Sequence, residues 1–387
     1  NLLGFSISGP ILKVVDKEYP DRKKSVLGFF ISGELSHIAD GGPSAIGMWK
    51  VKDEINQDII NDPLRPSGLG FGTFQNADFL GEENFEKIDA KLNVGSKRIN
   101  LQGKIEFKPS KNLNFILGGS YLHNDRTNYS YAGSLFNWEN NSQSVYDNWR
   151  TYIRITQKFG SQTTEEEANA LVKNVYYTLQ FDYEKTDNLN QDVTHKDNLF
   201  GYGYIGKFEH HVENNYSFGL DTTLNLSGYV HDNYIYILDT FIPGGVNVEA
   251  EKWTSRYFEM DDILANARGF RVDDDVSFGL GILNGEGIPS VYGLWTSPGS
   301  VSNSYSISDN GQFRVSAFGS ADIGDHAIEM GFEFEQRSFR SYAVGPVGLW
   351  SLARDMANMH IDQLDFTKPH ALYLRDDDGN LIYNDMG

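Results

Sequence analysis

Apolar and polar residues alternate along many segments of the chain, which is typical of strands with one apolar and one polar face. In 99–108, Ile99, Leu101 and Ile105 fall on one face, and lysines, a glutamate and amides fall on the other. The segment 174–186 repeats this design, with apolar or aromatic residues at alternate positions. We interpret both segments as strands that separate an apolar environment from water.

The same alternation predicts about ten strands in all, each of roughly ten residues. Their predicted ranges are 2–9, 25–37, 99–108, 113–122, 147–159, 174–186, 198–211, 215–231, 313–320 and 328–337. In the last of these, the polar face carries Glu329, Glu333, Glu335 and Arg337. Such a charged face cannot lie in a dry core, so we expect it to face water.

The links between the predicted strands alternate between short and long. Short links are predicted at 109–112, 212–214 and 322–326, moderate ones at 10–24 and 160–173, and long ones at 38–98, 123–146 and 232–312, with a shorter one at 187–197. Within 160–173, Thr164 and Glu167 have the spacing of a capping box and predict a short helix. Short turns at one end and long loops at the other are typical of a transmembrane β-barrel.

A large soluble β-sandwich or propeller is the alternative to a barrel. Sandwich strands average about five or six residues, and propellers repeat at about 40–50 residues. The predicted strands are longer than that, and the sequence shows no such repeat. We therefore predict an all-β fold in which 1–387 is part of a single transmembrane antiparallel β-barrel domain with long extracellular loops.

Composition narrows the classes of protein further. The chain of 387 residues has no cysteine, which excludes disulfide scaffolds, zinc ribbons, iron–sulfur sites and thiol catalysis. Its net charge of -20 argues against a nucleic-acid binder, which needs a basic surface. No apolar run reaches the ~18 residues of a membrane helix. Aromatic residues make up 13% of the chain, too many for a disordered acidic protein.

Four segments resemble one family of membrane proteins. They are Ser6–Lys13, Ser25–Ser32, Asn61–Pro66 and Gly345–Arg354. Together they are similar to the TonB-dependent outer-membrane receptors of Bacteroidota, in the Oar-like group that carries an N-terminal carboxypeptidase-like domain. The first two segments resemble the start of the barrel and the strand after it, the third a phrase in the first large outer loop, and the last a helical insert in a later loop.

The resemblance implies a multi-pass barrel of 22 strands in the outer membrane, surrounded by lipid and lipopolysaccharide. It also implies a plug coupled to the TonB–ExbB–ExbD system and the uptake of a ligand. About ten of those strands are expected here, with the plug and the remaining strands outside this sequence. The alternative function is a structural or accessory barrel in a larger outer-membrane complex, with surface lipoproteins or other outer-membrane proteins as partners.

No catalytic constellation stands out, so we expect no enzymatic activity and no required cofactor. The adjacent His210 and His211 point to opposite faces of a strand and cannot grip one ion together. Asp261 and Asp262 precede apolar residues and predict a helix N-terminus. The segment 349–361 has apolar residues near helical spacing and predicts a short amphipathic helix.

Aromatic side chains in the predicted outer loops are the candidate ligand contacts, because aromatic faces stack on sugars and grip peptides. The alternative is that they anchor the loops or form the interfacial girdles of a barrel. The candidates are Trp138, Tyr146, Trp253, Trp295 and Trp350.

One acidic segment is a candidate calcium site. Asp376, Asp378 and Asn380 place oxygen ligands at alternate positions, which resembles the opening of a calcium loop. The distal bidentate glutamate of such loops is missing, so a solvated β-turn is the alternative. No other metal is predicted.

Overall fold

The structure of the chain is a computed structural model. It describes residues 1–15, 21, 23–69, 72–159, 171–221, 226–261, 269–362 and 371–372.

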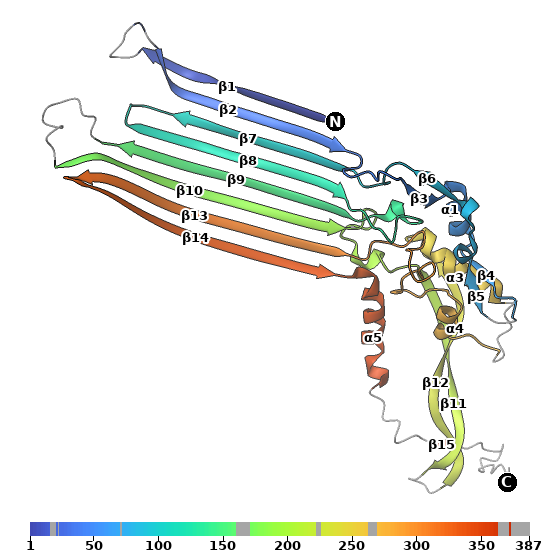
Figure 1. Ribbon diagram of the computed structural model, residues 1–387. Helices are drawn as coiled ribbons and strands as arrows, with labels where there is room; N and C mark the ends of the chain where they lie inside the picture. Colours follow the sequence, from blue (N-terminus) through green and yellow to red (C-terminus); the bar gives the residue numbers. More distant parts are fainter. Residues whose placement is uncertain are drawn as a thin grey trace.

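A single antiparallel sheet of eight long strands dominates the fold (Figure 1). The strands are 12 to 20 residues long, far above the roughly five or six residues of an average strand. In spatial order they are β1 (Leu2–Val15), β2 (Lys23–Ile38), β7 (Ser96–Phe107), β8 (Leu113–Thr127), β9 (Gln143–Lys158), β10 (Val172–Gln191), β13 (Tyr305–Ile323) and β14 (His326–Val344).

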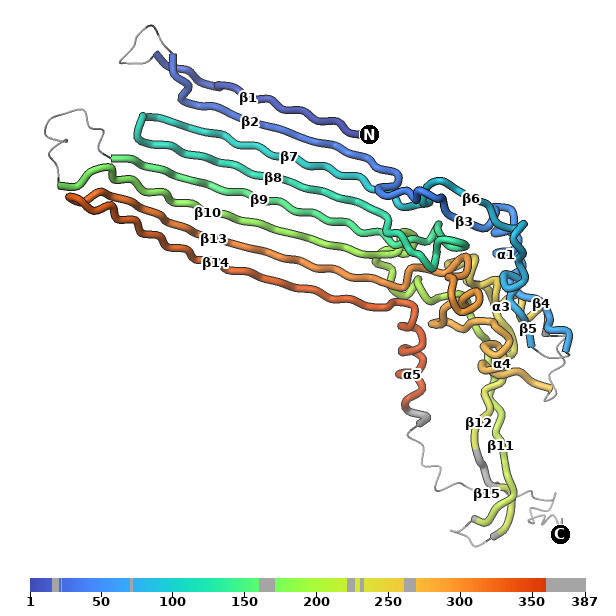
Figure 2. Tube along the Cα trace, in the orientation of Figure 1, coloured from blue at the N-terminus to red at the C-terminus, as the bar shows by residue number. Residues whose placement is uncertain are grey.

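The long connections all leave the sheet at one end and build a body that we call the loop body (Figure 2). It comprises the described parts of 39–95, 128–142, 192–304 and 345–362. Its elements are β3 (Met48–Val51), α1 (Asp53–Asn61), β4 (Leu64–Pro66), β5 (Thr73–Gln75), η1 (Asn76–Phe79), η2 (Glu82–Asn84), β6 (Phe85–Ile88), η3 (Trp138–Asn140), η4 (Leu199–Gly201), β11 (Gly206–Asp221), β12 (Leu226–Pro243), α3 (Val248–Asp261), α4 (Asp273–Phe278), η5 (Pro346–Gly348) and α5 (Leu349–Asp362), with β15 (Ala371–Leu372) beside β12.

The predicted β-rich class is confirmed, because 54% of the chain is strand and 17% is helix. Eight of the ten predicted strands form the large sheet, and each extends beyond its predicted range at one end or at both. The predicted helix at 349–361 is also confirmed, as α5. Among the described residues no sheet closes on itself, and the large sheet has open edges at β1 and β14.

The turn predicted at 212–214 is wrong. Val212 pairs with Tyr236 in the middle of a hairpin formed by β11 and β12, and Asn214 pairs with Tyr234. This hairpin projects from the loop body rather than joining the large sheet (Figure 1). The polar run around Asn214 fits a strand because a two-stranded hairpin with much solvent exposure on both faces tolerates polar residues in mid-strand.

Two further predictions concern helices. The prediction that Asp261 begins a helix is wrong, because Asp261 is the last residue of α3. A helix start with three carboxylates does occur, but at Asp273 in α4, where Asp275 accepts a hydrogen bond from the backbone N–H of Val272 at 2.9 Å. The helix predicted from Thr164 and Glu167 lies outside the described residues.

Register aligns the apolar positions of neighbouring strands into continuous rows. One row contains a large apolar side chain from each of seven adjacent strands, β2 to β14, without interruption. Its members are Phe29, Ile105, Leu117, Ile153, Phe181, Val315 and Phe334. A second row is Leu27, Phe107, Phe115, Ile155, Leu179, Ala317 and Phe332.

No described element covers these apolar rows. Phe332 is 63% exposed and Phe334 is 50% exposed, and neighbours such as Phe181 and Ile153 are also open. Because side chains alternate across a sheet, the opposite face carries the polar set. There Glu333 and Glu335 stand on the reverse side of β14, as the sequence predicts.

Most of the buried apolar residues lie in the loop body. One cluster combines Leu64 with residues of 192–304, including Trp253, Tyr257 and Met260. A second cluster joins three connections through Val51, Phe136 and Val291, among others. The loop body therefore has packed cores of its own, whereas the sheet has almost none.

The β13–β14 hairpin closes through a tight two-residue turn at Gly324 and Asp325. Gly324 has a φ of 61°, a conformation that disfavours residues with a Cβ. Two-residue hairpin turns commonly place glycine at the first central position for this reason.

We predict that Gly324→Val destabilises this hairpin by about 1–2 kcal/mol, because a β-branched residue is strained at positive φ. Thermal unfolding of the intact protein, followed by circular dichroism, measures the effect. Asp325→Asn is the matched control and should leave the midpoint unchanged. Equal midpoints for the Gly324→Val variant and the unmodified protein would contradict the prediction.

Candidate functional site

The polar face of the large sheet holds two hollows. The first, which we call the loop-end hollow, has a volume of about 570 Å³ and lies where the strands meet the loop body. The second, which we call the mid-sheet hollow, has a volume of about 490 Å³ and lies further along the strands. Both fall within the roughly 300–1,000 Å³ of small-molecule sites.

Amides and hydroxyls dominate the loop-end hollow. The Nδ2 of Asn188 donates to the Oγ of Ser308 at 3.0 Å, and the Oγ of Ser144 donates to the Oδ1 of Asn190 at 3.2 Å. The residues that line it are Asn124, Arg126, Ser144, Val145, Tyr146, Asn188, Leu189, Asn190, Ser306, Ile307, Ser308, Ser341, Tyr342 and Ala343. Such a surface offers neutral donors and acceptors to a polar solute.

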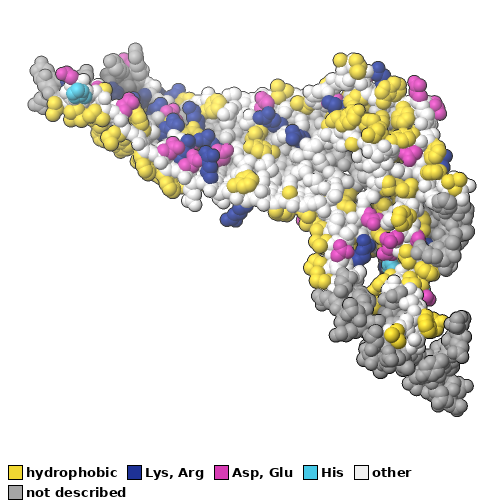
Figure 3. Space-filling model, turned by 60° about the horizontal axis from the view of Figure 1, so that its bottom comes forward, with side chains coloured by type: hydrophobic (Ala, Val, Ile, Leu, Met, Phe, Trp, Pro, Cys, Tyr) yellow, Lys and Arg dark blue, Asp and Glu magenta, His cyan; other side chains and the backbone are white. Residues whose placement is uncertain are grey.

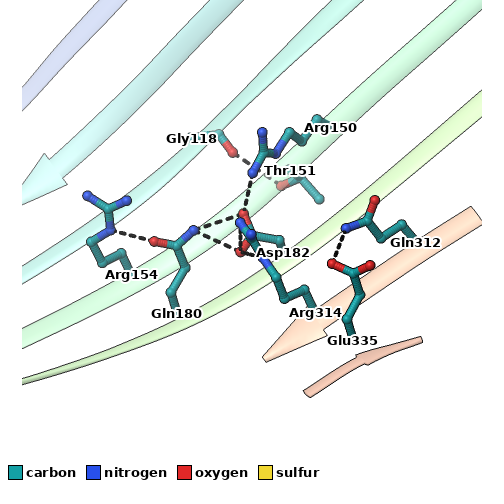
Figure 4. A network of polar contacts seen from close by, with 9 residues as sticks. All are labelled: Gly118, Arg150, Thr151, Arg154, Gln180, Asp182, Gln312, Arg314 and Glu335. Atoms are coloured by element: carbon teal, nitrogen blue, oxygen red, sulfur yellow. Dashed lines mark hydrogen bonds and ion pairs between the residues drawn. The ribbon is translucent and has the colours of Figure 1, made fainter. Parts of the chain in front are cut away.

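A buried carboxylate organises the mid-sheet hollow (Figure 4). Asp182 is only 5% exposed and accepts hydrogen bonds from Arg150 at 2.9 Å and from Arg314 at 3.2 Å. The side-chain amide of Gln180 donates to both of its oxygens at 2.8 and 2.9 Å. The Oε1 of Gln180 in turn accepts from the Nε of Arg154 at 2.6 Å. Four side chains from β9, β10 and β13 are thereby fixed around Asp182.

A third hollow, of about 660 Å³, opens along the apolar rows. Its lining includes Leu179, Ala317, Ile328, Met330 and Phe332. It offers almost no polar partner, so it suits an alkyl chain rather than a hydrated solute.

The structure places the five aromatic candidates in different settings. Trp138 is 8% exposed and Trp253 is 3% exposed, and both are packed into the cores of the loop body. The prediction of an outer-loop position is wrong for Tyr146, which lies in β9 and pairs with Asn188. Tyr146 is half-buried and lines the loop-end hollow. Of the five, only Tyr146 belongs to a described hollow.

The other two tryptophans are half-buried anchors. Trp295 packs against the second loop core, and its ring centroid lies 5.2 Å from that of Tyr131. The indole N–H of Trp350 donates to the carbonyl of Phe200 at 2.7 Å. Trp350 also packs on Tyr204, with centroids 5.3 Å apart. These contacts fit the interpretation of aromatic residues as loop anchors, and ligand contact by them stays a prediction.

The candidate calcium ligands Asp376, Asp378 and Asn380 lie outside the described residues. Within the part of the chain that the structure describes, no group of three or more histidines and carboxylates could hold a metal ion. The two adjacent histidines of β11 have separate partners: His210 contacts Asp273 at 2.7 Å, and His211 contacts Asp239 at 2.7 Å.

The network around Asp182 was not predicted from the sequence. Arg150, Asp182 and Arg314 each occupy a polar position in an alternating strand, so the sequence predicts that they lie on the polar face. The sequence does not predict the register that sets Asp182 opposite Arg314 on β13. The sequence predicts a loop at 187–197 and so does not assign Asn188 and Asn190 to a strand, whereas β10 continues to Gln191.

Comparison with protein-family models, with curated proteins and with solved structures finds no match for this chain. Among the described helices, none is both long enough and apolar enough to cross a membrane.

We predict that Trp253→Ala loosens the loop body, because truncating a buried tryptophan costs about 3–5 kcal/mol. Limited proteolysis of the intact protein measures the effect as faster cleavage within 192–304. Tyr146→Ala is the comparison variant and should leave the cleavage rate unchanged. Unchanged cleavage in the Trp253→Ala variant would contradict the role of Trp253 as an anchor.

A histidine links the projecting hairpin to α4. The hydrogen bond to Asp273 raises the pKa of His210 above its ordinary value, and the nearby Asp239 adds to this while burial and Arg354 oppose it. A group with a raised folded-state pKa stabilises the fold below its unfolded pKa, and this contribution disappears as pH rises through the folded value.

We therefore predict that the contact between β11 and α4 weakens as pH rises from about 6 to 8, because the ordinary histidine pKa is about 6.5. Hydrogen exchange of the segment 269–278, corrected for the intrinsic pH dependence, measures the contact. His210→Gln should abolish the pH dependence, whereas His211→Gln should retain it. Equal protection of this segment at both pH values in the unmodified protein would contradict the prediction.

Proposed function

We propose that this chain forms part of the wall of an outer-membrane β-barrel of the TonB-dependent receptor type, which takes up a ligand through its lumen. One observation carries the proposal. The large sheet presents uninterrupted apolar rows on one face and a charged, hydrogen-bonded network on the other, with nothing described that covers the apolar face.

The dimensions of the apolar surface support a membrane setting. On β2 the apolar positions run from Leu27 to Leu35, which matches the roughly 9–11 residues that span a bilayer as a tilted strand. Lipid would cover these side chains, and the polar face would line a water-filled lumen. In a soluble protein, water would hydrate the polar face favourably, but the apolar face would need another layer of protein to cover it.

The connections support the same orientation. The described two-residue turn at Gly324 and Asp325 and the short link 108–112 lie at one end of the sheet, and the loop body lies at the other (Figure 2). In outer-membrane barrels, short turns face the periplasm and long loops face outward. We therefore assign the loop body to the outside of the cell.

The two open edges call for further strands. β1 and β14 each present an unpaired edge among the described residues, and unpaired backbone groups in lipid are costly. We propose that strands elsewhere in the polypeptide pair with these edges and close the barrel. The plug and its coupling to the TonB–ExbB–ExbD system rest on the sequence resemblance alone.

A structural role in a larger outer-membrane complex is the second candidate. The projecting β11–β12 hairpin favours it, because Phe218 and Val212 are 64% and 50% exposed on a two-stranded ribbon. Isolated two-stranded ribbons are marginally stable in water. Purification of the intact protein from its native membrane separates the two functions. A bound small ligand supports uptake, and stoichiometric outer-membrane proteins support the scaffold.

Single cysteines test the membrane setting directly, because the sequence contains no cysteine of its own. Val315→Cys and Ala317→Cys place a thiol on the apolar face of β13, and Gln312→Cys and Ser316→Cys place one on the polar face, where Gln312 donates to Glu335. In membranes that contain the intact protein, we expect a charged, water-soluble maleimide to label only the second pair. A lipid-soluble maleimide should label the first pair.

Denatured samples are the control, in which all four thiols should react with the water-soluble reagent. If that reagent labels all four positions equally in the folded protein, the apolar face is wet and the proposal fails.

A further inference from the structure

The lining of the mid-sheet hollow is positively charged, although the chain as a whole is negatively charged. The chain carries a net charge of -20, yet Lys104, Arg150 and Arg154 line this hollow with Asp182 as the one carboxylate among its lining residues. The lining therefore has an excess of two positive charges. Figure 3 shows charged side chains gathered on the sheet away from the loop body.

Two of the three cations make no ion pair within the described part of the chain. The charge of Lys104 acts on Glu106 without an ion pair between them. Arg154 donates a hydrogen bond to the neutral Gln180 and lies 5.8 Å from the ring centroid of Tyr152. Two further carboxylates on the polar face, Glu106 and Glu184, each have a hydrogen-bonded partner outside the hollow. Glu106 pairs with Lys108 at 2.8 Å, and Glu184 accepts from Asn148 at 2.9 Å.

The third cation is held in place. Arg150 donates to the buried Asp182, which Arg314 and Gln180 also contact. A guanidinium has five N–H donors, and the bond to Asp182 engages only one of its nitrogen atoms. Asp182 therefore fixes the orientation of Arg150 while leaving donors for another acceptor, which reduces the entropy lost on binding.

The shape of the hollow depends on a glycine. A Cβ at Gly118 would lie 2.5 Å from the ring of Tyr152, so the absence of a side chain there leaves room for that ring beside β8. Tyr152 and Phe30 then form apolar walls beside the cations. The hollow thus combines charged donors with flat apolar surface in a volume of about 490 Å³.

We propose that the mid-sheet hollow is a binding site for the carboxylate or phosphate group of a small anionic solute, with Lys104, Arg150 and Arg154 as its ligands. Guanidinium and ammonium groups bind these anions through short, charge-assisted hydrogen bonds. This inference rests on the proposed function, in which the polar face lines the lumen, and it names the chemical class of solute that the lumen would favour.

Inorganic phosphate and citrate are the probes, titrated separately into the intact protein in detergent by calorimetry at low ionic strength. We expect at least one of them to bind and its affinity to fall with added salt, because the site is open to screening. Lys104→Gln and Arg154→Gln should each weaken binding about tenfold, the effect of losing one charge-assisted hydrogen bond.

Lys158→Gln is the matched control. Lys158 lies on the same polar face of β9 as Arg154, four residues further along the strand and outside the hollow. The Lys158→Gln variant should bind the probes as tightly as the unmodified protein does. Equal thermal midpoints for the three variants show that they are folded. Binding of citrate alone supports a carboxylate solute, and binding of phosphate alone supports a phosphorylated one.

Three results would overturn the proposal. In the first, neither probe binds. In the second, a probe binds equally well to the Lys104→Gln and Arg154→Gln variants, which indicates an adventitious ion only. In the third, these variants lower the thermal midpoint without any probe binding, which indicates that acidic side chains of the same polypeptide fill the hollow. If the cysteine labelling still separates the two faces, these results remove the anion site alone. Labelling of all four cysteines by the charged reagent removes the membrane setting instead.

Discussion

Strict two-residue alternation, kept in register across neighbouring strands, is the constraint on which the structure depends. A slip of one residue in any strand would move its apolar side chains to the polar face. Between β2 and β14 the alignment holds, so that Phe29 and Phe334 end the same apolar row and Phe30 and Glu335 end the adjacent polar one. Backbone hydrogen bonds satisfy the polar groups of the chain, and the side chains then determine what each face contacts.

The loop body and the large sheet differ in how their apolar side chains are buried. The loop body buries Trp253, Met260 and Val291 in cores of the ordinary kind. The sheet leaves Phe332 and Met330 open and depends on its surroundings to cover them. Helices and short strands could form at the loop end because their apolar residues have each other as partners. The sheet's long strands have one apolar and one polar face because apolar and polar residues alternate along them.

Alternation in the sequence was sufficient to predict the eight strands of the sheet, because its period is local. It was insufficient for β11 and β12, since a ribbon with polar residues such as Asn214 and Glu213 in mid-strand carries no consistent period. The residues of the candidate site also differ in how far the sequence predicts them. Tyr146 is a candidate from its residue type alone, and the sequence placed it in a loop, whereas the set around Asp182 depends on which residues of β9 and β13 face β10. Pairing across 132 residues, as between Asp182 and Arg314, leaves no local signal.

The second loop core has a consequence for the order of folding. Val51, Phe136 and Val291 come from three different connections, which leave the sheet between β2 and β7, between β8 and β9, and between β10 and β13. Contacts between such distant residues form slowly, because the chain entropy lost in closing the intervening segments must be overcome first. We therefore expect this core to pack after the strands have paired. A strand paired out of register would leave Phe136 and Trp138 exposed, and exposed apolar surface makes a chain prone to aggregation.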